Sequence, residues 1–397
     1  MDDLEPTLLL VPLLAVLAPL AARALGPWLR IPVLVFELLL GILVGPSLLG
    51  WAQPSAFMDT LSEVGLAMLF FVAGMEIEFG VLRGRTGRGA IVGWLVSLVA
   101  GTAVGWLFAP GLGAVVVGVA LSSTALGTLL PILRDNGELR TPFGRAVGAL
   151  GAVGEFGPLV AISVLLGARQ PGIATVVLGA FLLIAAAAIW FALRTPQGAL
   201  HRIVNTTLHT SGQFAIRIVL LILAALVAVS LVLDIDILLG AFAAGVVWRL
   251  LMRDAAEADR EAVDSKVEAL AFGFLVPVFF VYTGITFDLA SLLADPVLLL
   301  LVPVALVAMF VVRGFPSGLV APAGASWRER MPVMLLGATG LPIIVAVTAI
   351  GVDEGLIDSP LASVLVGAGM LSVLLFPLIA MSMRGERARA SMAEEDA

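Results

Sequence analysis

Long apolar runs constrain this chain more than any other feature of its sequence. Between charges, glycines and prolines, runs of about 17 to 25 residues recur along its whole length. Lipid offers no water to backbone polar groups, so runs of this length indicate membrane-spanning helices. The predicted spans, about thirteen in number, are 7–25, 33–49, 61–80, 90–109, 112–133, 141–167, 173–193, 214–233, 236–252, 268–287, 296–319, 330–352 and 361–383. We therefore expect an all-α polytopic membrane protein.

The composition agrees with this expectation and excludes several classes of protein. Of 397 residues, 60% are hydrophobic and only 13% are charged, which is incompatible with an ordinary soluble surface. Cysteine is absent, which excludes disulfides, thiolate metal sites and iron–sulfur clusters. The only histidines, His201 and His209, lie in one polar loop without a metal-ligand pattern. We expect no cofactor, no enzyme activity and no nucleic-acid partner, and the acidic start MDDLEP predicts no cleavable signal.

The charges of the connecting loops alternate and predict the orientation of the chain. One set of loops and the tail carry most of the basic residues, namely Arg23, Arg30, Arg83, Arg85, Arg88, Arg134, Arg140, Arg194, Arg202, Arg253, Arg260, Lys266, Arg328, Arg330, Arg384, Arg387 and Arg389. The opposite loops are acidic, with Arg169 as their basic exception. Since basic loops stay in the cytoplasm, we expect the inner membrane, an external N-terminus and a cytoplasmic C-terminus.

An acidic residue lies near the middle of the predicted span 141–167. Glu155 is about 20 Å along the helix from Thr141, close to the midplane of an apolar layer about 30 Å thick. A carboxylate at that depth is costly unless it faces a cavity or a partner. Glycines at 148, 151, 154 and 157 let other backbones approach this helix, and Pro158 removes one backbone donor beside the carboxyl. Glu155 is either a proton or cation site or a protonated carboxyl bonded to a neighbouring helix.

Two predicted spans are interrupted. Ser122, Ser123 and Thr124 lie in the middle of one, and Thr339, Gly340 and Pro342 in the middle of another. Corresponding interruptions in two halves of a chain predict an inverted-repeat transporter whose site lies where the broken helices cross. The predicted division is a first six-helix repeat at 1–167, a linker helix and cytoplasmic loop at 168–213, a second inverted repeat at 214–384 and a short tail at 385–397. The alternative is that the Ser/Thr and Pro residues at these two places only form ordinary kinks in membrane helices.

Two further charges lie inside apolar runs. Glu37 is a few residues into the second predicted span, where it is either a functional relay or a carboxyl bonded near the interface. Arg313 is the one basic residue within a long apolar run. It either extends along its own stem to the cytoplasmic surface or pairs in the core with Glu155 or with helix dipole ends.

Three segments together resemble the monovalent cation:proton antiporter family, nearest its Kef-type and bacterial sodium/proton exchanger branches. They are ELLLGILVGPSLLG (37–50), GLAMLFFVAGMEIEFGVLR (65–83) and ALSSTALGTLLPILRDNGELRTPFGR (120–145). The resemblance implies that Glu155 stands where the family has its carrier aspartate, and that Arg313 is the family's basic residue before the second broken helix. It also implies a homodimer, in which a core of the fourth to sixth and eleventh to thirteenth helices moves against a dimerisation domain.

The sequence departs from that family in two places. Gly154 precedes Glu155 where the family usually has an acidic or amide residue, which leaves the ion and the stoichiometry open. The C-terminal nucleotide-binding domain of Kef-type proteins is not part of the sequence, so gating of that kind is not expected.

The function expected from these features is exchange of Na⁺ or K⁺ for H⁺ by alternating access. Glu155 would bind either ion, with the hydroxyls of Ser123 and Thr124 as further oxygen ligands. One titrating carboxyl at the crossover predicts electroneutral exchange. A cation channel, and a sodium-coupled symporter for an organic anion, are the competing functions.

Overall fold

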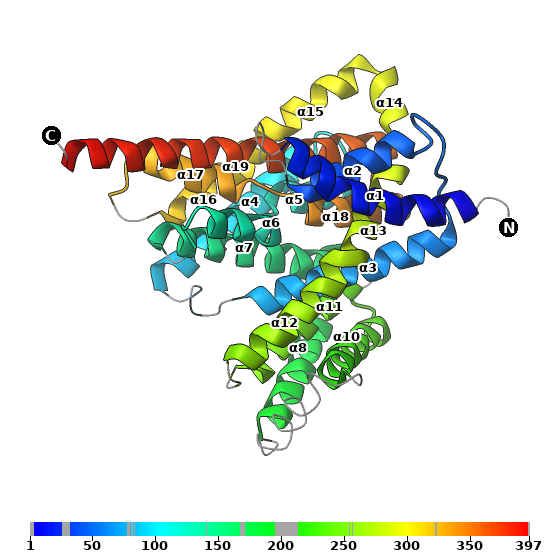
Figure 1. Ribbon diagram of the computed structural model, residues 1–397, viewed down its shortest axis with the longest axis horizontal. Helices are drawn as coiled ribbons and strands as arrows, with labels where there is room; N and C mark the ends of the chain where they lie inside the picture. The colour runs from blue at the N-terminus through cyan, green and yellow to red at the C-terminus, as the bar shows by residue number, and fades with distance from the viewer. Residues whose placement is uncertain are drawn as a thin grey trace. The chain divides into compact units, whose positions relative to one another are not determined.

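Helices make up the regular structure of the chain (Figure 1). The computed structural model describes residues 4–25, 32–77, 80, 82, 84–139, 141–166, 171–194, 213–253, 255, 257–321 and 324–395. In these ranges there are helices and no β-strand, which confirms the predicted all-α fold. The histidines and several loop charges of the sequence prediction lie outside the described residues, namely Arg30, Arg83, Arg140, Arg169, His201, Arg202 and His209.

Many of the helices are long and apolar enough to cross a membrane. Within the described residues they number nine, or ten if the bent pair formed by α17 (Trp327–Gly337) and α18 (Pro342–Asp353) is one span. The nine are Thr7–Ala24, Ala56–Glu76, Gly84–Gly105, Leu112–Leu130, Pro142–Leu166, Phe214–Val232, Glu257–Ala294, Pro296–Val320 and Ser359–Arg384. Two apolar helices, α2 (Val33–Val44) and α11 (Ile237–Leu251), are shorter. A polytopic membrane protein is therefore confirmed, whereas the predicted count of thirteen spans is not.

The chain divides into two compact units. Unit 1 comprises Met1–Val16, Trp51–Ile77 and Leu159–Thr283, and unit 2 comprises Leu17–Gly50, Glu78–Pro158 and Gly284–Ala397. The helices of unit 1 are α3 (Ala56–Glu76), η1 (Ile162–Leu166), α8 (Pro171–Arg194), α10 (Phe214–Val232), α11, α12 (Glu257–Leu270), η2 (Ala271–Leu275) and most of α13 (Val276–Thr286). The predicted inverted repeats are a different division of the chain and stay a prediction.

In unit 1, α11 packs against both α3 and α10 (Figure 1). The contact with α3 is made through glycines. A methyl group added at Gly74 would lie 2.2 Å from the carbonyl oxygen of Phe242, and one at Gly245 would lie 2.0 Å from that of Phe71. Because helices in lipid associate by close packing, these glycines bring the two backbones together.

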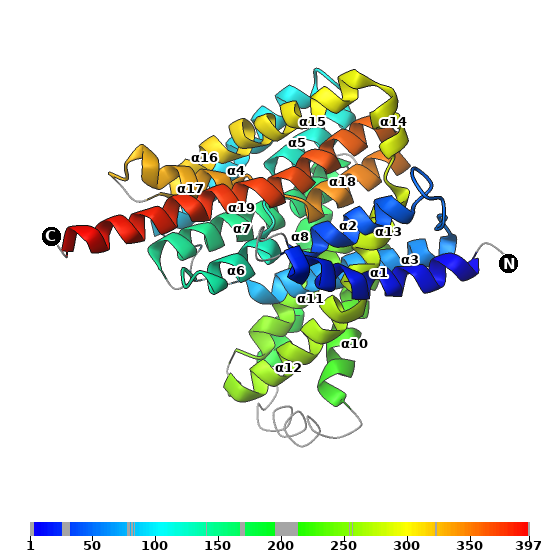
Figure 2. The ribbon, with the colours of Figure 1, turned by 45° about the horizontal axis from the view of Figure 1, so that its top comes forward.

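Helix α1 (Leu4–Leu25) is divided between the two units, and unit 2 holds the other helices. They are α2, α4 (Gly84–Gly105), α5 (Leu112–Ser122), α6 (Leu126–Asp135), most of α7 (Pro142–Ala161), α14 (Leu289–Ala294), α15 (Pro296–Met309), η3 (Phe310–Gly314), α16 (Phe315–Ser317), η4 (Gly318–Val320), α17, α18 and α19 (Ser359–Glu395). Here α4 packs on α5 through Gly101 and Gly118, and α19 runs along α15, α17 and α18 (Figure 2).

Both predicted interruptions are present in unit 2. The first helix ends as α5 at Ser122 and resumes as α6 at Leu126. The hydroxyls of Ser122 and Ser123 donate to the carbonyls of Val119 and Ala120, so these side chains compete with the helical ladder. The second helix ends as α17 at Gly337 and resumes as α18 at Pro342, with a bend of 44° between the two parts.

Candidate functional site

The carboxyl of Glu155 lies at the first break. Its Oε1 accepts hydrogen bonds from the backbone amides of Leu126, at 3.0 Å, and of Gly127, at 3.5 Å. These amides open α6, so the carboxyl meets the positive end of the helix dipole. Glu155 is 4% exposed. The buried carboxyl therefore has backbone amides as partners, at a helix end freed by the interruption.

A proline on the same helix explains how the break is attached to α7. Pro158 has no amide hydrogen, so it cannot donate to the carbonyl of Gly154 four residues earlier. The amide of Thr124, which has left the helical ladder at the break, donates to that carbonyl instead, at 3.0 Å. The break between α5 and α6 therefore supplies the donor that Pro158 lacks. This bond fixes the unwound segment to Gly154, one residue from Glu155.

Arg313 lies fully buried in the π-helical segment η3, with 0% exposure. Its Nε donates to Oγ1 of Thr124 at 2.9 Å, and its Nη2 donates to the carbonyl of Leu150 at 3.1 Å. Oγ1 of Thr124 in turn donates to the carbonyl of Gly337 at 2.6 Å. Complete burial excludes the alternative in which Arg313 extends to the surface. The guanidinium instead stands by the carbonyl end of α17, where a cation offsets the negative end of the helix dipole.

Gly154 has no space for a larger side chain. A methyl group added there would lie 2.5 Å from Cβ of Thr124, 2.6 Å from its Oγ1 and 2.9 Å from Nη2 of Arg313. The position at which the resemblance leads us to expect an acidic or amide side chain is therefore occupied by Thr124 and the guanidinium. This gives the departure from the family pattern a physical reason, because the arrangement requires a glycine beside Glu155.

The second break contacts the first. The amide of Ala125 donates to the carbonyl of Thr339 at 2.8 Å. A methyl group added at Gly340 would lie 2.9 Å from Oγ of Ser123, so the two unwound segments touch. Pro342 takes the first position of α18, where its missing amide hydrogen costs nothing. The structure thus brings together Ser123, Thr124, Gly154, Glu155, Arg313, Thr339 and Gly340.

Glu37 does not take part in these contacts. It lies on α2 with 5% exposure, and the hydrogen bonds that connect the two breaks, Glu155 and Arg313 in the described residues do not include it. Its helix approaches the end of α13 closely, since a methyl group at Gly284 would lie 2.2 Å from the carbonyl oxygen of Leu38. Glu37 is thus buried within unit 2, and both alternatives, a functional relay and a carboxyl bonded near the interface, stay predictions.

Four contributors to these contacts do not stand out in the sequence. The amides of Leu126 and Gly127 and the carbonyl of Leu150 are backbone groups of apolar or small residues, so no side-chain pattern marks them. Ser372 on α19 bonds the unwound Gly340 and was not singled out either. The sequence does carry a signal for Ser372, because a serine that follows two glycines in an apolar run is typical of a small-residue helix face.

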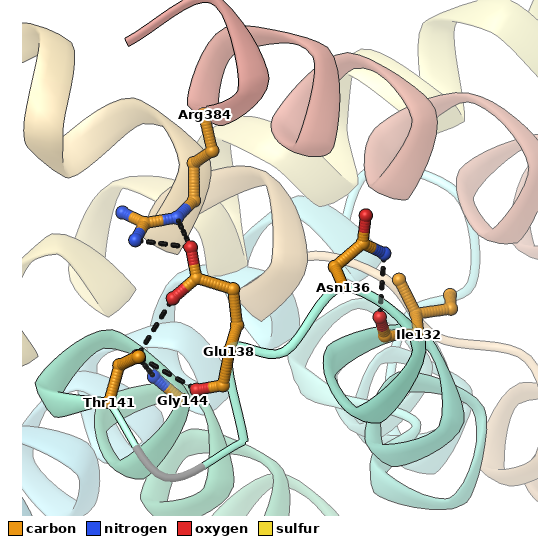
Figure 3. Close-up of polar contacts among 6 residues, drawn as sticks. All are labelled: Ile132, Asn136, Glu138, Thr141, Gly144 and Arg384. Atoms are coloured by element: carbon orange, nitrogen blue, oxygen red, sulfur yellow. Dashed lines mark hydrogen bonds and ion pairs between the residues drawn. The ribbon is translucent and has the colours of Figure 1, made fainter. Parts of the chain in front are cut away.

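A polar cluster joins the C-terminal helix to the loop between α6 and α7 (Figure 3). Arg384 on α19 donates from Nε to Oε1 of Glu138 at 2.6 Å and lies 4.0 Å above the ring of Phe143. Glu138 also accepts from the hydroxyl of Thr141, whose Oγ1 accepts from the amide of Gly144 at the start of α7. The loop that connects the broken helix to the helix of Glu155 is therefore anchored to α19.

Comparisons with known proteins agree with the all-helical membrane fold. A family model described as "Sodium/hydrogen exchanger, transmembrane" matches residues 13–381. The chain is 24% identical to a Na(+)/H(+) antiporter of Enterococcus hirae, covering 88% of this chain and 91% of that protein. It is 28% identical to the Na(+)/H(+)-K(+) antiporter GerN of Bacillus cereus, over 65% of this chain and 66% of GerN. The protein YjbQ of Bacillus subtilis is 23% identical over 94% of this chain, which spans only 62% of YjbQ.

Among solved structures, the sodium proton antiporter MjNhaP1 from Methanocaldococcus jannaschii is similar, with a TM-score of 0.65. The similarity covers 95% of this chain and 96% of that one at 19% sequence identity, so the two share a fold.

Proposed function

Because this chain belongs to the sodium/hydrogen exchanger family, we propose that it exchanges a monovalent cation, Na⁺ or K⁺, for protons across the cell inner membrane. One observation carries the proposal. The buried carboxyl of Glu155 lies at the amide end of α6, in the break of the first interrupted helix. Relatives named as Na(+)/H(+) and Na(+)/H(+)-K(+) antiporters support both candidate cations.

The carboxyl of Glu155 is suited to carry either ion. When the proton has left, the amides of Leu126 and Gly127 stabilise the anion, and the apolar surroundings favour its neutralisation by a proton or an alkali cation. Ser123 contributes a hydroxyl oxygen beside the second break, and carbonyl oxygens of the unwound segments complete a hard oxygen ligand set. Thr124 already accepts a bond from Arg313, so we assign these two residues to holding the breaks together rather than to binding the cation.

Competition for one carboxyl is sufficient to couple the two fluxes. If the protein opens to one side at a time, and Glu155 must be neutralised to change sides, each cation that enters requires a proton to leave. Position 154 offers no second carboxyl, since Thr124 and Arg313 fill its space. We therefore infer electroneutral one-for-one exchange, in a homodimer that works by alternating access.

Proteoliposomes provide the direct test. Addition of Na⁺ or K⁺ should drive proton movement in the wild type, and Glu155→Gln should abolish it while the protein stays folded. Glu155→Asp should retain a fraction of the rate. Asp236→Asn is a matched control, because Asp236 caps α11 in unit 1 and asparagine caps a helix equally well. Full exchange in Glu155→Gln would overturn the mechanism and make Glu37 the next carrier to test. Cation flux that persists without an opposing proton gradient would indicate a channel.

The charge and orientation of the exchanger can be measured separately. Electroneutral exchange predicts a rate that is independent of membrane voltage, and a voltage-dependent rate would require a second charge carrier. A reporter fused after Ala397 should be cytoplasmic and a tag before Asp2 external. If both ends lie on the same side, the number of spans is even and the inverted-repeat division is wrong.

A further inference from the structure

The peptide groups of Gly340 lie outside the helical ladder. α17 ends at Gly337 and α18 begins at Pro342, so the amide and the carbonyl of Gly340 have no regular helical partners there. In the apolar interior such groups must be bonded in some other way. Ser372 of α19 does this for both. The amide of Gly340 donates to Oγ at 3.1 Å, and Oγ donates to the carbonyl of Gly340 at 3.0 Å.

The surface of α19 is shaped for this contact. Ser372 is fully buried, and its Oγ also lies 2.8 Å from the carbonyl of Gly369, one turn earlier. A methyl group added at Gly369 would lie 3.0 Å from the carbonyl oxygen of Gly340. Gly369 leaves space for the unwound peptide to approach α19, and Ser372, three residues later on the same face, is then close enough to bond it.

A continuous path of backbone bonds leads from this contact to the carboxyl of Glu155. The residue before Gly340 is Thr339, whose carbonyl accepts from the amide of Ala125 at 2.8 Å. The residue after Ala125 is Leu126, whose amide donates to Oε1 of Glu155 at 3.0 Å. Each step joins adjacent peptides or a direct hydrogen bond, so the position of the Gly340 peptide fixes the position of the amide that holds the carboxyl.

We infer that Ser372 is a positioning residue for ion exchange at Glu155. It holds the unwound peptide of Gly340 against α19, and through Thr339 and Ala125 it keeps the amide end of α6 directed at the carboxyl. This inference rests on the proposed exchange function. It adds a residue of α19, a helix that contributes no side chain to the proposed ligand set.

The test compares three serine variants in proteoliposomes with the intact chain. In Ser372→Ala, the buried amide and carbonyl of Gly340 lose their partner, so the break relaxes and the carboxyl is held less well. The concentration of Na⁺ or K⁺ that gives half-maximal exchange should rise about tenfold, and the pH profile should shift. Ser372→Cys keeps a weaker donor of similar size and should fall between Ser372→Ala and the wild type. Ser363→Ala, a buried serine on the same helix, should leave both measures unchanged.

The outcomes distinguish the inference from the proposed function. A purely structural role for Ser372 would lower the melting temperature or the yield of Ser372→Ala and leave its half-maximal concentration equal to that of Ser363→Ala, which would overturn the inference alone. If Ser372→Ala does not fold, Ser372→Cys decides, and a half-maximal concentration equal to that of the wild type contradicts the inference. A wild type that moves no protons with any alkali cation would overturn the proposed function and the inference with it.

Discussion

The two units bury different kinds of side chain. In the described part of the chain, the buried charged residues Glu37, Glu155 and Arg313 all belong to unit 2. The buried polar residues of unit 1 carry only hydroxyls, namely Thr7, Ser62, Ser163 and Ser230. Both units join helices through glycines, at Gly74 and Gly245 in one and at Gly101 and Gly118 in the other. Close helix packing is therefore common to both, whereas buried charge is not.

The difference has an electrostatic cause. A charge in the apolar interior is costly unless dipoles or partners offset it. Unit 2 has two interrupted helices, whose ends in the interior offer amides to Glu155 and carbonyls to the region of Arg313. The short helix α11 of unit 1 begins at a loop aspartate, Asp236, that caps it. Broken helices thus make the charges of Glu155 and Arg313 tolerable, and we expect the chemistry that depends on them in unit 2.

The largest effect is expected from removing the buried guanidinium of Arg313. Arg313→Ala should lower the initial exchange rate about a hundredfold, because losing one buried hydrogen-bonded charge costs on the order of 3 kcal/mol. Arg313 bonds Thr124 in the break that holds Glu155, so the pH profile of the remaining activity should also change. Arg313→Lys should retain much of the activity. The pH profile of purified variants in proteoliposomes measures this, and an unchanged profile in folded Arg313→Ala would separate Arg313 from the carboxyl.

A smaller effect is expected at the glycine beside Glu155. Gly154→Ala places a methyl group against Thr124 and Arg313, and overpacking of this kind costs about 1–3 kcal/mol of unfolding free energy. Gly148→Ala is the matched control on the same helix, since a methyl group there meets nothing within 4 Å. Thermal unfolding of the two variants should differ by several degrees, with Gly148→Ala at or above the wild type. Equal destabilisation would mean that the space at position 154 is not restricted.

A weaker contribution is expected from the anchor of α19 to the loop between α6 and α7. Arg384→Ala removes a partly exposed ion pair with Glu138 and the contact with Phe143. The expected loss is about 1 kcal/mol. High concentrations of choline chloride should reduce the difference from the wild type, since salt screens such pairs without supplying a transported cation. A loss of several kcal/mol would place this cluster among the buried interactions of unit 2.

The smallest effect is expected in unit 1. Ser230→Ala removes a buried hydroxyl that has no hydrogen-bond partner among the described residues. Unfolding temperature and exchange rate should both stay close to the wild type, because no bond is lost. A large fall in exchange rate would show that buried polar groups of unit 1 also serve transport, and would break the contrast between the units.

The sequence by itself determined the features that depend on local composition. Apolar runs dictated helices of membrane length, since lipid leaves backbone groups no other partners. Hydroxyls at 122–124 and the Gly–Leu–Pro segment at 340–342 placed both breaks, because these residues disturb the ladder of their own helix. Depth along an apolar run also marked Glu155 and Arg313 as residues that require partners.

Only the tertiary structure decided which partners they have. The amide that holds Glu155 is 29 positions away in sequence, and the hydroxyl that Arg313 bonds is 189 positions away. Ser372 reaches Gly340 across 32 positions. Most of these contacts use backbone groups, which every residue carries, so no residue type marks them in advance. Their positions follow from how closely the glycine and serine faces of neighbouring helices pack, and that is a property of the folded unit rather than of any one segment.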